Sequence, residues 1–109
     1  MSLVDVGQGS EVPTGTMKSY SVGGKQVLIA NINGKLYAVD SICTHAGGDL
    51  SKGKLEGEIV TCPKHHSKFN LATGKCISGP QIGFLKLKTK DISSYEVKAE
   101  DNRIKVNIP

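Results

Sequence analysis

The chain has 109 residues, with 14 lysines and arginines against 10 aspartates and glutamates, and its formal net charge is +4. This length corresponds to one domain over residues 1–109 and leaves no room for a separate catalytic domain. A pI near 9.0 is common among nucleic-acid-binding proteins, but here the lysines are spread along the chain. With only 5% aromatic residues, the composition also offers no platform for stacking bases, so we expect no nucleic-acid partner.

The hydropathy pattern predicts no membrane segment. No run approaches the roughly 20 apolar residues that cross a bilayer, and the longest apolar patch, residues 27–30, has the length of a strand. The N-terminal residues MSLVDVGQGS lack a basic segment followed by an apolar stretch, which a signal peptide requires. We therefore expect a cytoplasmic protein.

The first strongly patterned element is a β-hairpin. Residues 27–32 and 35–39 flank Asn33-Gly34, a dipeptide that readily adopts the positive φ angles of a type I′ turn. Residues 43–82 follow and are rich in glycine, proline and polar turn formers. A segment with so little apolar content cannot build its own core, so we interpret residues 43–82 as an inserted subdomain that a bound metal group would order.

Two further elements follow this insertion. Residues 84–90 are predicted to form a strand. Residues 95–99 then alternate apolar and polar side chains, Asp101-Asn102 provides a turn, and residues 104–108 alternate back. The pattern predicts an all-β protein whose base is a small antiparallel β-sandwich, with both hairpins contributing to one core.

Two cysteine–histidine pairs lie within the insertion. Cys43-Thr44-His45 and Cys62-Pro63-Lys64-His65 are separated by sixteen residues. Thiolate and imidazole are ligands that transition metals favour, so the pairs indicate a metal site. A structural zinc site usually pairs cysteine with cysteine and histidine with histidine, whereas each pair here is mixed. If each loop offers its sulfur to one metal and its imidazole to a second, a two-metal cluster results.

Simpler explanations of the pairs remain. The same four residues could hold zinc, or the site could be empty. A disulfide between Cys43 and Cys62 would leave the positions of His45 and His65 unexplained, and three cysteines is an odd number. We expect His66 to be a solvent-facing neighbour and Cys76 to be a small buried side chain without a partner.

The segments CTHAGGDL at 43–50 and CPKHHSKFNLATGKC at 62–76 resemble the cluster-binding boxes of the Rieske 2Fe-2S family. This resemblance implies a base of antiparallel strands that carries a cluster-binding subdomain with two ligand loops at its tip and a proline-containing loop beside them. It implies one 2Fe-2S cluster, with one iron bound by Cys43 and Cys62 and the other by His45 and His65. Around the cluster it implies three supporting positions, namely Ser67, Phe69 and Pro80. The alternative for Gly79-Pro80 is an ordinary turn.

Two departures from the family pattern bear on function. In the cytochrome-complex branch an extra cysteine in each box forms a bracing disulfide, but Gly48 and Lys64 occupy those positions here. This points toward soluble Rieske-type ferredoxins. High-potential members use a serine and a tyrosine to donate hydrogen bonds to the cluster; Ser67 matches the serine, whereas Phe69 replaces the tyrosine. We therefore expect a potential in the lower half of the approximate Rieske span of −150 to +300 mV.

The implied function is that of a one-electron carrier. The sequence shows no nucleophile with a general acid and base, so we expect no enzymatic activity. The resemblance implies that the protein passes electrons from a reductase, by family analogy a flavoprotein, to an oxygenase or another redox enzyme. Two alternatives are a Rieske-like small subunit of a larger oxidoreductase and a structural zinc-binding module. Lysines near the boxes suggest steering toward an acidic partner surface.

Overall fold

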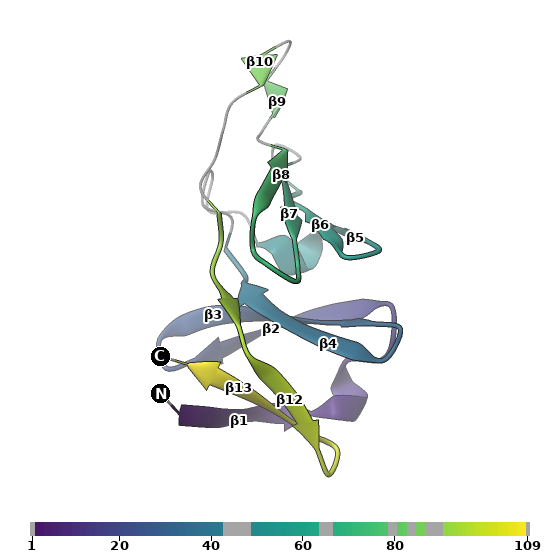
Figure 1. The fold of residues 1–109 in the computed structure, drawn as a ribbon, viewed down its shortest axis with the longest axis vertical. Helices are drawn as coiled ribbons and strands as arrows, with labels where there is room; N and C mark the ends of the chain where they lie inside the picture. The colour runs from purple at the N-terminus through teal and green to yellow at the C-terminus, as the bar shows by residue number, and fades with distance from the viewer. Residues whose placement is uncertain are drawn as a thin grey trace.

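The computed structural model describes residues 2–42, 49–63, 67–78, 81–82, 85–86 and 91–108. These residues form antiparallel strands and two short 3-10 helices, η1 (Gly9–Glu11) and η2 (Leu50–Lys52). The predicted all-β class is confirmed. Figure 1 shows two sheets at the base of the molecule and a third sheet above them.

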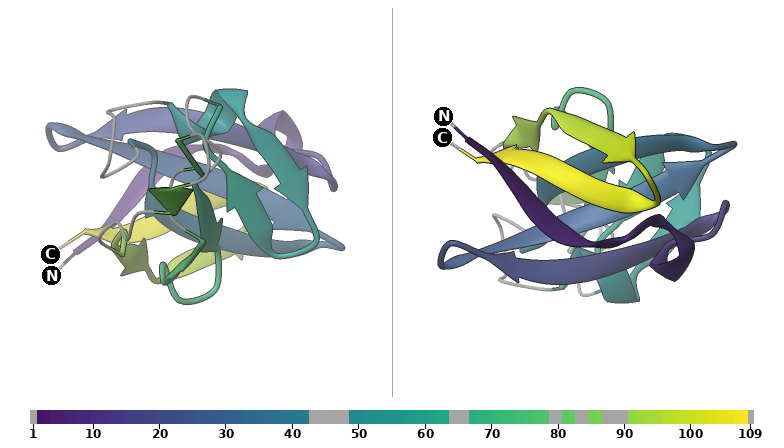
Figure 2. Two further views of the ribbon diagram at one scale, coloured as in Figure 1. Left: turned by 90° about the horizontal axis from the view of Figure 1, so that it is seen from above. Right: turned by 90° about the horizontal axis from the view of Figure 1, so that it is seen from below.

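Two sheets make up the base. The first has the strand order β1-β13-β12, with bounds Ser2–Gln8, Arg103–Ile108 and Val97–Glu100. The second has the order β11-β4-β3-β2, with bounds Ser94–Tyr95, Lys35–Asp40, Lys25–Ile32 and Thr16–Val22. Seen from below, β1, β13 and β12 cross the face of the second sheet (Figure 2). The predicted sandwich base is therefore present.

The third sheet carries the residues of the predicted insertion. Its order is β5-β6-β7-β8, with bounds Lys54–Glu56, Ile59–Thr61, Lys68–Asn70 and Cys76–Ser78. Farther from the base lies a two-stranded ladder of β9 (Gln81–Ile82) and β10 (Leu85–Lys86). Of the strand predicted over residues 84–90, the structure describes only Leu85–Lys86, which is a strand.

Both predicted hairpins form. β3 and β4 are joined by Asn33 and Gly34, with φ angles of 53° and 88°, as a type I′ turn requires. β12 and β13 are joined by Asp101 and Asn102, which also have positive φ. Polar side chains of this kind tolerate the left-handed region better than most, which explains why they occupy the turn.

The prediction of one continuous strand over residues 95–99 was wrong. Tyr95 pairs with Ala38 in one base sheet, whereas Val97 pairs with Val106 in the other. The chain changes sheet at Glu96, whose carbonyl accepts a hydrogen bond of 2.8 Å from Asn107 N. Alternation of side chains records which face is buried, but not which sheet a residue joins, so the sequence could not show this crossing.

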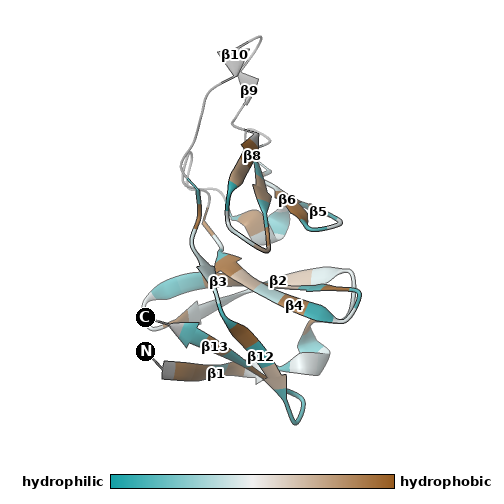
Figure 3. Ribbon diagram, in the orientation of Figure 1, coloured by the Kyte–Doolittle hydropathy of each residue, from teal (hydrophilic) through white to brown (hydrophobic). Residues whose placement is uncertain are grey.

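The predicted core shared by the two hairpins is present, and a second core lies on the opposite face of the β2-β3-β4-β11 sheet. One lies between the two base sheets and contains Val12, Val22, Val27, Ile29, Ala38, Ile104 and Val106. The other lies toward the third sheet and contains Leu28, Ala30, Tyr37, Val39, Leu50, Val60, Cys62, Phe69, Leu71 and Ile92. Successive residues of β3 thus enter opposite cores, which explains the unbroken apolar run from 27 to 30. Figure 3 shows brown, apolar stretches in both the base and the upper sheet.

Candidate metal centre

The first box lies between β4 and η2. Cys43 and His45 fall outside the described residues, but the residues on either side of that segment are paired with each other. Ile42 and Asp49 form an antiparallel bridge, and Leu50 N donates a 2.8 Å hydrogen bond to the carbonyl of Ser41. The described residues on either side of positions 43–48 are therefore fixed to each other at the end of β4.

The Asp49 side chain stabilises this pairing through hydrogen bonds. Its Oδ1 accepts hydrogen bonds from Ser51 N at 3.0 Å, Ser51 Oγ at 2.6 Å and Ser41 Oγ at 3.1 Å. Partial burial raises the pKa of Asp49, but the hydrogen bonds from Ser51 and Ser41 outweigh burial and hold the pKa below its ordinary value. The sequence analysis assigned no role to Asp49. Its signal in the sequence was an aspartate, a residue favoured at helix N-caps, directly before Leu50 at the start of η2.

The second box begins directly after β6 and contains β7, and its first residues, 62–67, connect these two strands. Cys62 N donates a 2.7 Å hydrogen bond to the carbonyl of Ser67, which continues the Thr61–Lys68 pairing by one step. Cys62 is 1% exposed and Ser67 is fully buried. Because Lys64, His65 and His66 lie outside the described residues, the structure places Cys62 but leaves the predictions for these histidines untested.

The Ser67 hydroxyl is the most unusual group at this site. Its Oγ is buried and has no hydrogen-bond partner within the described parts of the chain. A buried hydroxyl without a partner costs about 1–3 kcal/mol, so native proteins rarely keep one without a reason. A polarisable, electron-rich acceptor bound beside Cys62 would satisfy this hydroxyl, and the donor set therefore fits an iron–sulfur cluster.

Phe69 belongs to the core under this box. It is fully buried in β7, where it pairs with Val60 on β6 and with Cys76 on β8. A phenyl ring has no hydrogen-bond donor. Of the two supporting positions Ser67 and Phe69, only Ser67 can therefore donate a hydrogen bond from its side chain. Cys76 itself is half-buried rather than fully buried as expected, and it packs against the same core.

Gly53 holds η2 and β5 against the second box. A Cβ atom at this position would lie 1.8 Å from the carbonyl oxygen of Thr61 and 3.2 Å from the Pro63 side chain. Any side chain would push β5 away from β6, which ends at Thr61 directly before Cys62. The sequence analysis missed this role because a single glycine in a turn-rich segment carries no sign of what it approaches.

Two contacts tie the third sheet to the base. Tyr37 Oη donates a 2.9 Å hydrogen bond to Glu58, and this bond raises the pKa of Tyr37 above its ordinary value. Ile92 N donates to the carbonyl of Gly74 at 2.8 Å, and Gly74 has a φ of +79°, which disfavours other residues. The segment that bears the boxes is thus joined to the base through both packing and hydrogen bonds.

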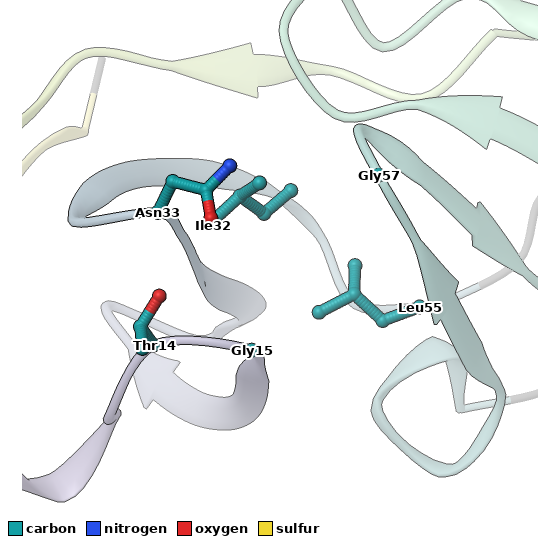
Figure 4. Close-up of a pocket in the computed structure, with 6 residues that line it drawn as sticks. All are labelled: Thr14, Gly15, Ile32, Asn33, Leu55 and Gly57. Atoms are coloured by element: carbon teal, nitrogen blue, oxygen red, sulfur yellow. The ribbon is translucent and has the colours of Figure 1, made fainter.

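One hollow near this junction is lined by residues without catalytic chemistry. It is a pocket of about 410 Å³ lined by Thr14, Gly15, Ile32, Asn33, Leu55 and Gly57 (Figure 4). None of these six residues is ionisable, so the pocket lacks a general acid, a general base and an activated nucleophile.

The remaining predictions about this site concern residues beyond the described ranges. Pro80 and Gly79 lie outside them, as do Cys43, His45 and His65. No three histidine, cysteine, aspartate or glutamate side chains are grouped so that they could hold a metal ion within the described ranges 2–42, 49–63 and 67–78. In the same described part of the chain, no helix has the length and hydrophobicity needed to cross a membrane.

Comparison with known proteins gives a consistent picture. The family model described as Rieske [2Fe-2S] domain matches residues 2–96. A ferredoxin component of naphthalene 1,2-dioxygenase/salicylate 5-hydroxylase systems from Ralstonia sp is 36% identical over 94 residues, which cover 86% of this chain and 84% of that protein. The cytochrome b6-f complex iron-sulfur subunit of Chlorobaculum tepidum is 42% identical over 103 residues, 94% of this chain but 52% of the subunit.

Among solved structures, the fold matches a chain from a complex of reduced oxygenase and oxidized ferredoxin in carbazole 1,9a-dioxygenase. The TM-score is 0.81 with 28% sequence identity, and the match covers 95% of this chain and 100% of that chain. The likeness therefore extends over the base as well as over the sheet that carries the boxes.

Proposed function

Because the chain belongs to the Rieske [2Fe-2S] domain family, we propose that it is a cytoplasmic one-electron carrier, a single Rieske domain that receives electrons from a reductase and delivers them to an oxygenase or another redox enzyme. Cys43, His45, Cys62 and His65 would bind one 2Fe-2S cluster, within a subdomain spanning about residues 43–82. When bound, a cluster with this ligand set supplies a centre that accepts and releases one electron and is neutral in its oxidised form.

The observation that carries this proposal is the geometry of the second box. The Cys62–Ser67 backbone hydrogen bond brings together, at the same loop end, a buried thiol and a buried hydroxyl that has no hydrogen-bond partner among the described residues. Ser67 Oγ is available to donate a hydrogen bond to a cluster sulfur. Such a bond favours the more negative, reduced state and so raises the potential, whereas Phe69 can make no equivalent contribution. We propose a potential in the lower half of the approximate span of −150 to +300 mV.

The partners are proposed from the relatives. The Ralstonia protein is a ferredoxin component of a dioxygenase system, and this chain matches it over most of both lengths. The carbazole 1,9a-dioxygenase structure contains a complex of an oxygenase with a ferredoxin. These similarities support an oxygenase as electron acceptor, and we propose a reductase, by family analogy a flavoprotein, as donor.

One similarity favours a second candidate, a subunit of a larger electron-transfer complex. The cytochrome b6-f iron-sulfur subunit has 42% identity, although this chain spans about half of its length. Gly48 and Lys64 stand where that branch of the family has its bracing cysteines, which supports the ferredoxin role instead. Size-exclusion chromatography of the protein from its native source tests this alternative, because a permanent subunit would co-elute with large partners.

The decisive experiment is metal analysis with spectroscopy of the natively expressed protein. We expect two iron atoms per chain, a coloured oxidised form and, after dithionite reduction, an electron paramagnetic resonance signal with the low average g value of mixed nitrogen and sulfur ligation. Replacement of Cys43, His45, Cys62 or His65 by alanine should abolish that signal. A colourless protein with one zinc and negligible iron would refute the proposal and establish the zinc-binding module.

A further inference from the structure

The segment that carries the second box has an excess of positive charge. Residues 43–82 contain five lysines against three acidic residues. Of these lysines, Lys52, Lys54, Lys68 and Lys75 are described and exposed. The ion pairs of the described chain all lie in the base, between Lys18 and Glu11, Arg103 and Asp5, and Lys105 and Glu100. The lysines of the upper sheet are therefore free to attract an external anionic group.

Strand register gathers part of this charge on one face. Lys54 on β5 pairs with Thr61 on β6, and Thr61 pairs with Lys68 on β7. Directly paired residues project from the same face of a sheet. The neighbouring row, Leu55–Val60–Phe69, enters the core, so the Lys54–Thr61–Lys68 row lies on the opposite face, where Lys54 and Lys68 are exposed and Thr61 between them is buried.

The charge on this outer face is polarised toward the second box. Lys54 and Lys68 flank Thr61, the residue directly before Cys62. Glu56, the acidic residue of β5, pairs with Ile59 and therefore lies two residues farther from the box. An approaching protein meets positive charge at the end where Cys62 lies and negative charge only at the far end.

A groove lies beside this row. It has a volume of about 280 Å³ and is lined by Lys52, Gly53, Lys54, Thr61, Cys62 and Pro63. Because Gly53 has no side chain, its backbone packs directly against Thr61 and the floor of the groove stays open. Two lysines at the rim and the exposed Pro63 ring give a basic edge around a partly apolar floor, the arrangement expected of a protein–protein interface.

We propose that the groove and the row of Lys54, Thr61 and Lys68, together called the basic face, dock a carboxylate-rich surface of the electron-transfer partner. This inference rests on the proposed function, since a partner must approach the box at Cys62. Opposite charge steers two proteins into a productive orientation and raises the association rate. The partner is a protein rather than a nucleic acid, because this face presents no exposed aromatic ring among the described residues: Phe69 is fully buried.

The test uses two charge-matched variants. Lys54→Glu with Lys68→Glu reverses the basic face, and Lys35→Glu with Lys98→Glu reverses two exposed lysines of the base. Each double variant lowers the formal net charge from +4 to zero, because every substitution removes one positive charge and adds one negative charge. Any difference between them therefore reports the position of the charge and not its total.

The probes are ferric cytochrome b5, an acidic haem protein, and ferric cytochrome c, a basic one. Dissociation constants with the iron-loaded protein are measured by calorimetry at about 50 mM and about 500 mM salt, where the screening length differs several-fold. The basic-face variant should weaken binding of cytochrome b5 about tenfold or more at low salt, whereas the base variant should change it less than about threefold. A second readout is the rate at which each ferric haem gains one electron from the dithionite-reduced protein.

Three outcomes would overturn the proposal: equal effects of the two variants, binding of cytochrome b5 that is insensitive to salt, or tighter binding of a single-stranded DNA oligonucleotide than of cytochrome b5. Iron content is measured on every sample. Loss of the iron signal in the unmodified protein would refute the proposed function, whereas intact iron with unselective binding would refute only the basic face.

Discussion

Removal of the buried hydroxyl of Ser67 should leave unchanged or increase the stability of the metal-free protein, and it should lower the reduction potential of the cluster-bound protein. In the metal-free protein, Ser67→Ala deletes a fully buried donor that has no partner in the described structure. Because an unsatisfied buried hydroxyl costs about 1–3 kcal/mol, we expect the variant to be as stable as the unmodified protein or more stable, by up to about that amount. Urea unfolding of both metal-free proteins measures the difference.

In the cluster-bound protein, the same substitution should lower the reduction potential. A hydrogen bond to a charged acceptor contributes roughly 1.5–3 kcal/mol. Because a one-electron potential changes by about 59 mV for each factor of ten in the equilibrium, that energy corresponds to a decrease of roughly 65–130 mV if the bond forms mainly in the reduced state. A redox titration followed by electron paramagnetic resonance measures it.

The control is Ser21→Ala, which removes an exposed hydroxyl from β2 in the base. It should leave the potential unchanged and alter stability by less than about 0.5 kcal/mol. Two results for Ser67→Ala would refute the reasoning: an unchanged potential, or a metal-free variant that is less stable than the unmodified protein by more than about 1 kcal/mol. An unmodified midpoint well above about +100 mV would also contradict the expected lower half of the span.

Three further substitutions test the structure around the boxes. Gly53→Ala places a Cβ 1.8 Å from Thr61 O, so the strands must separate, and we expect a loss of about 1–3 kcal/mol or more in unfolding free energy together with reduced iron loading. Tyr37→Phe removes the 2.9 Å hydrogen bond to Glu58 and should cost about 0.5–1.5 kcal/mol in chemical denaturation. Asp49→Asn removes a carboxylate whose pKa is held low, so its destabilisation should be complete near neutral pH and should diminish as acid protonates the unmodified Asp49.

The sign of the Asp49 effect follows from linkage. Its pKa is lower in the folded protein, so its ionised form contributes stability that is present above the unfolded pKa and is lost as the pH falls through the folded pKa. Urea unfolding of both proteins between about pH 2 and pH 7 measures this convergence. A constant difference across that range would contradict the role assigned to the Ser51 and Ser41 hydrogen bonds.

Gly53→Ala and Tyr37→Phe each have a matched control variant elsewhere in the chain. Gly57→Ala has no atom within 4 Å of the added Cβ but keeps a positive φ, so it reports the cost of backbone conformation alone. Should Gly53→Ala cost no more than Gly57→Ala, the close approach to Thr61 is not the reason for glycine. Tyr20→Phe removes a comparable 2.9 Å bond to Glu11 within the base, and only Tyr37→Phe should loosen the third sheet in hydrogen exchange.

Local patterns in the sequence were sufficient for the hairpins and the metal-binding residue types. Asn33-Gly34 and Asp101-Asn102 identify their turns because positive φ is a property of the residues themselves. Gly23-Gly24 carried the same kind of signal for the β2–β3 hairpin, which the sequence analysis did not predict, and both glycines do have positive φ. The mixed cysteine–histidine pairs likewise indicate a metal site directly from ligand chemistry.

Contacts between distant segments were decided only by the tertiary structure. The unbroken apolar run at residues 27–30 is consistent with a strand buried on both faces, but it does not show which segments pack on each face, so the separate cores of Val27 and Leu28 depend on neighbours remote in the chain. The reach of Gly53 to Thr61 and of Tyr37 to Glu58 depends on how two sheets are placed relative to each other.

The role of the Ser67 hydroxyl was recognised from the sequence and the tertiary structure together. Its place within the second box was visible in the sequence, but its burial and its lack of a partner among the described residues required the packed structure. The sequence by itself determined which chemical groups the protein can offer to a metal and where its chain turns. The tertiary structure decided which of those groups are desolvated, because burial and hydrogen bonding are set by neighbours that are remote in the chain.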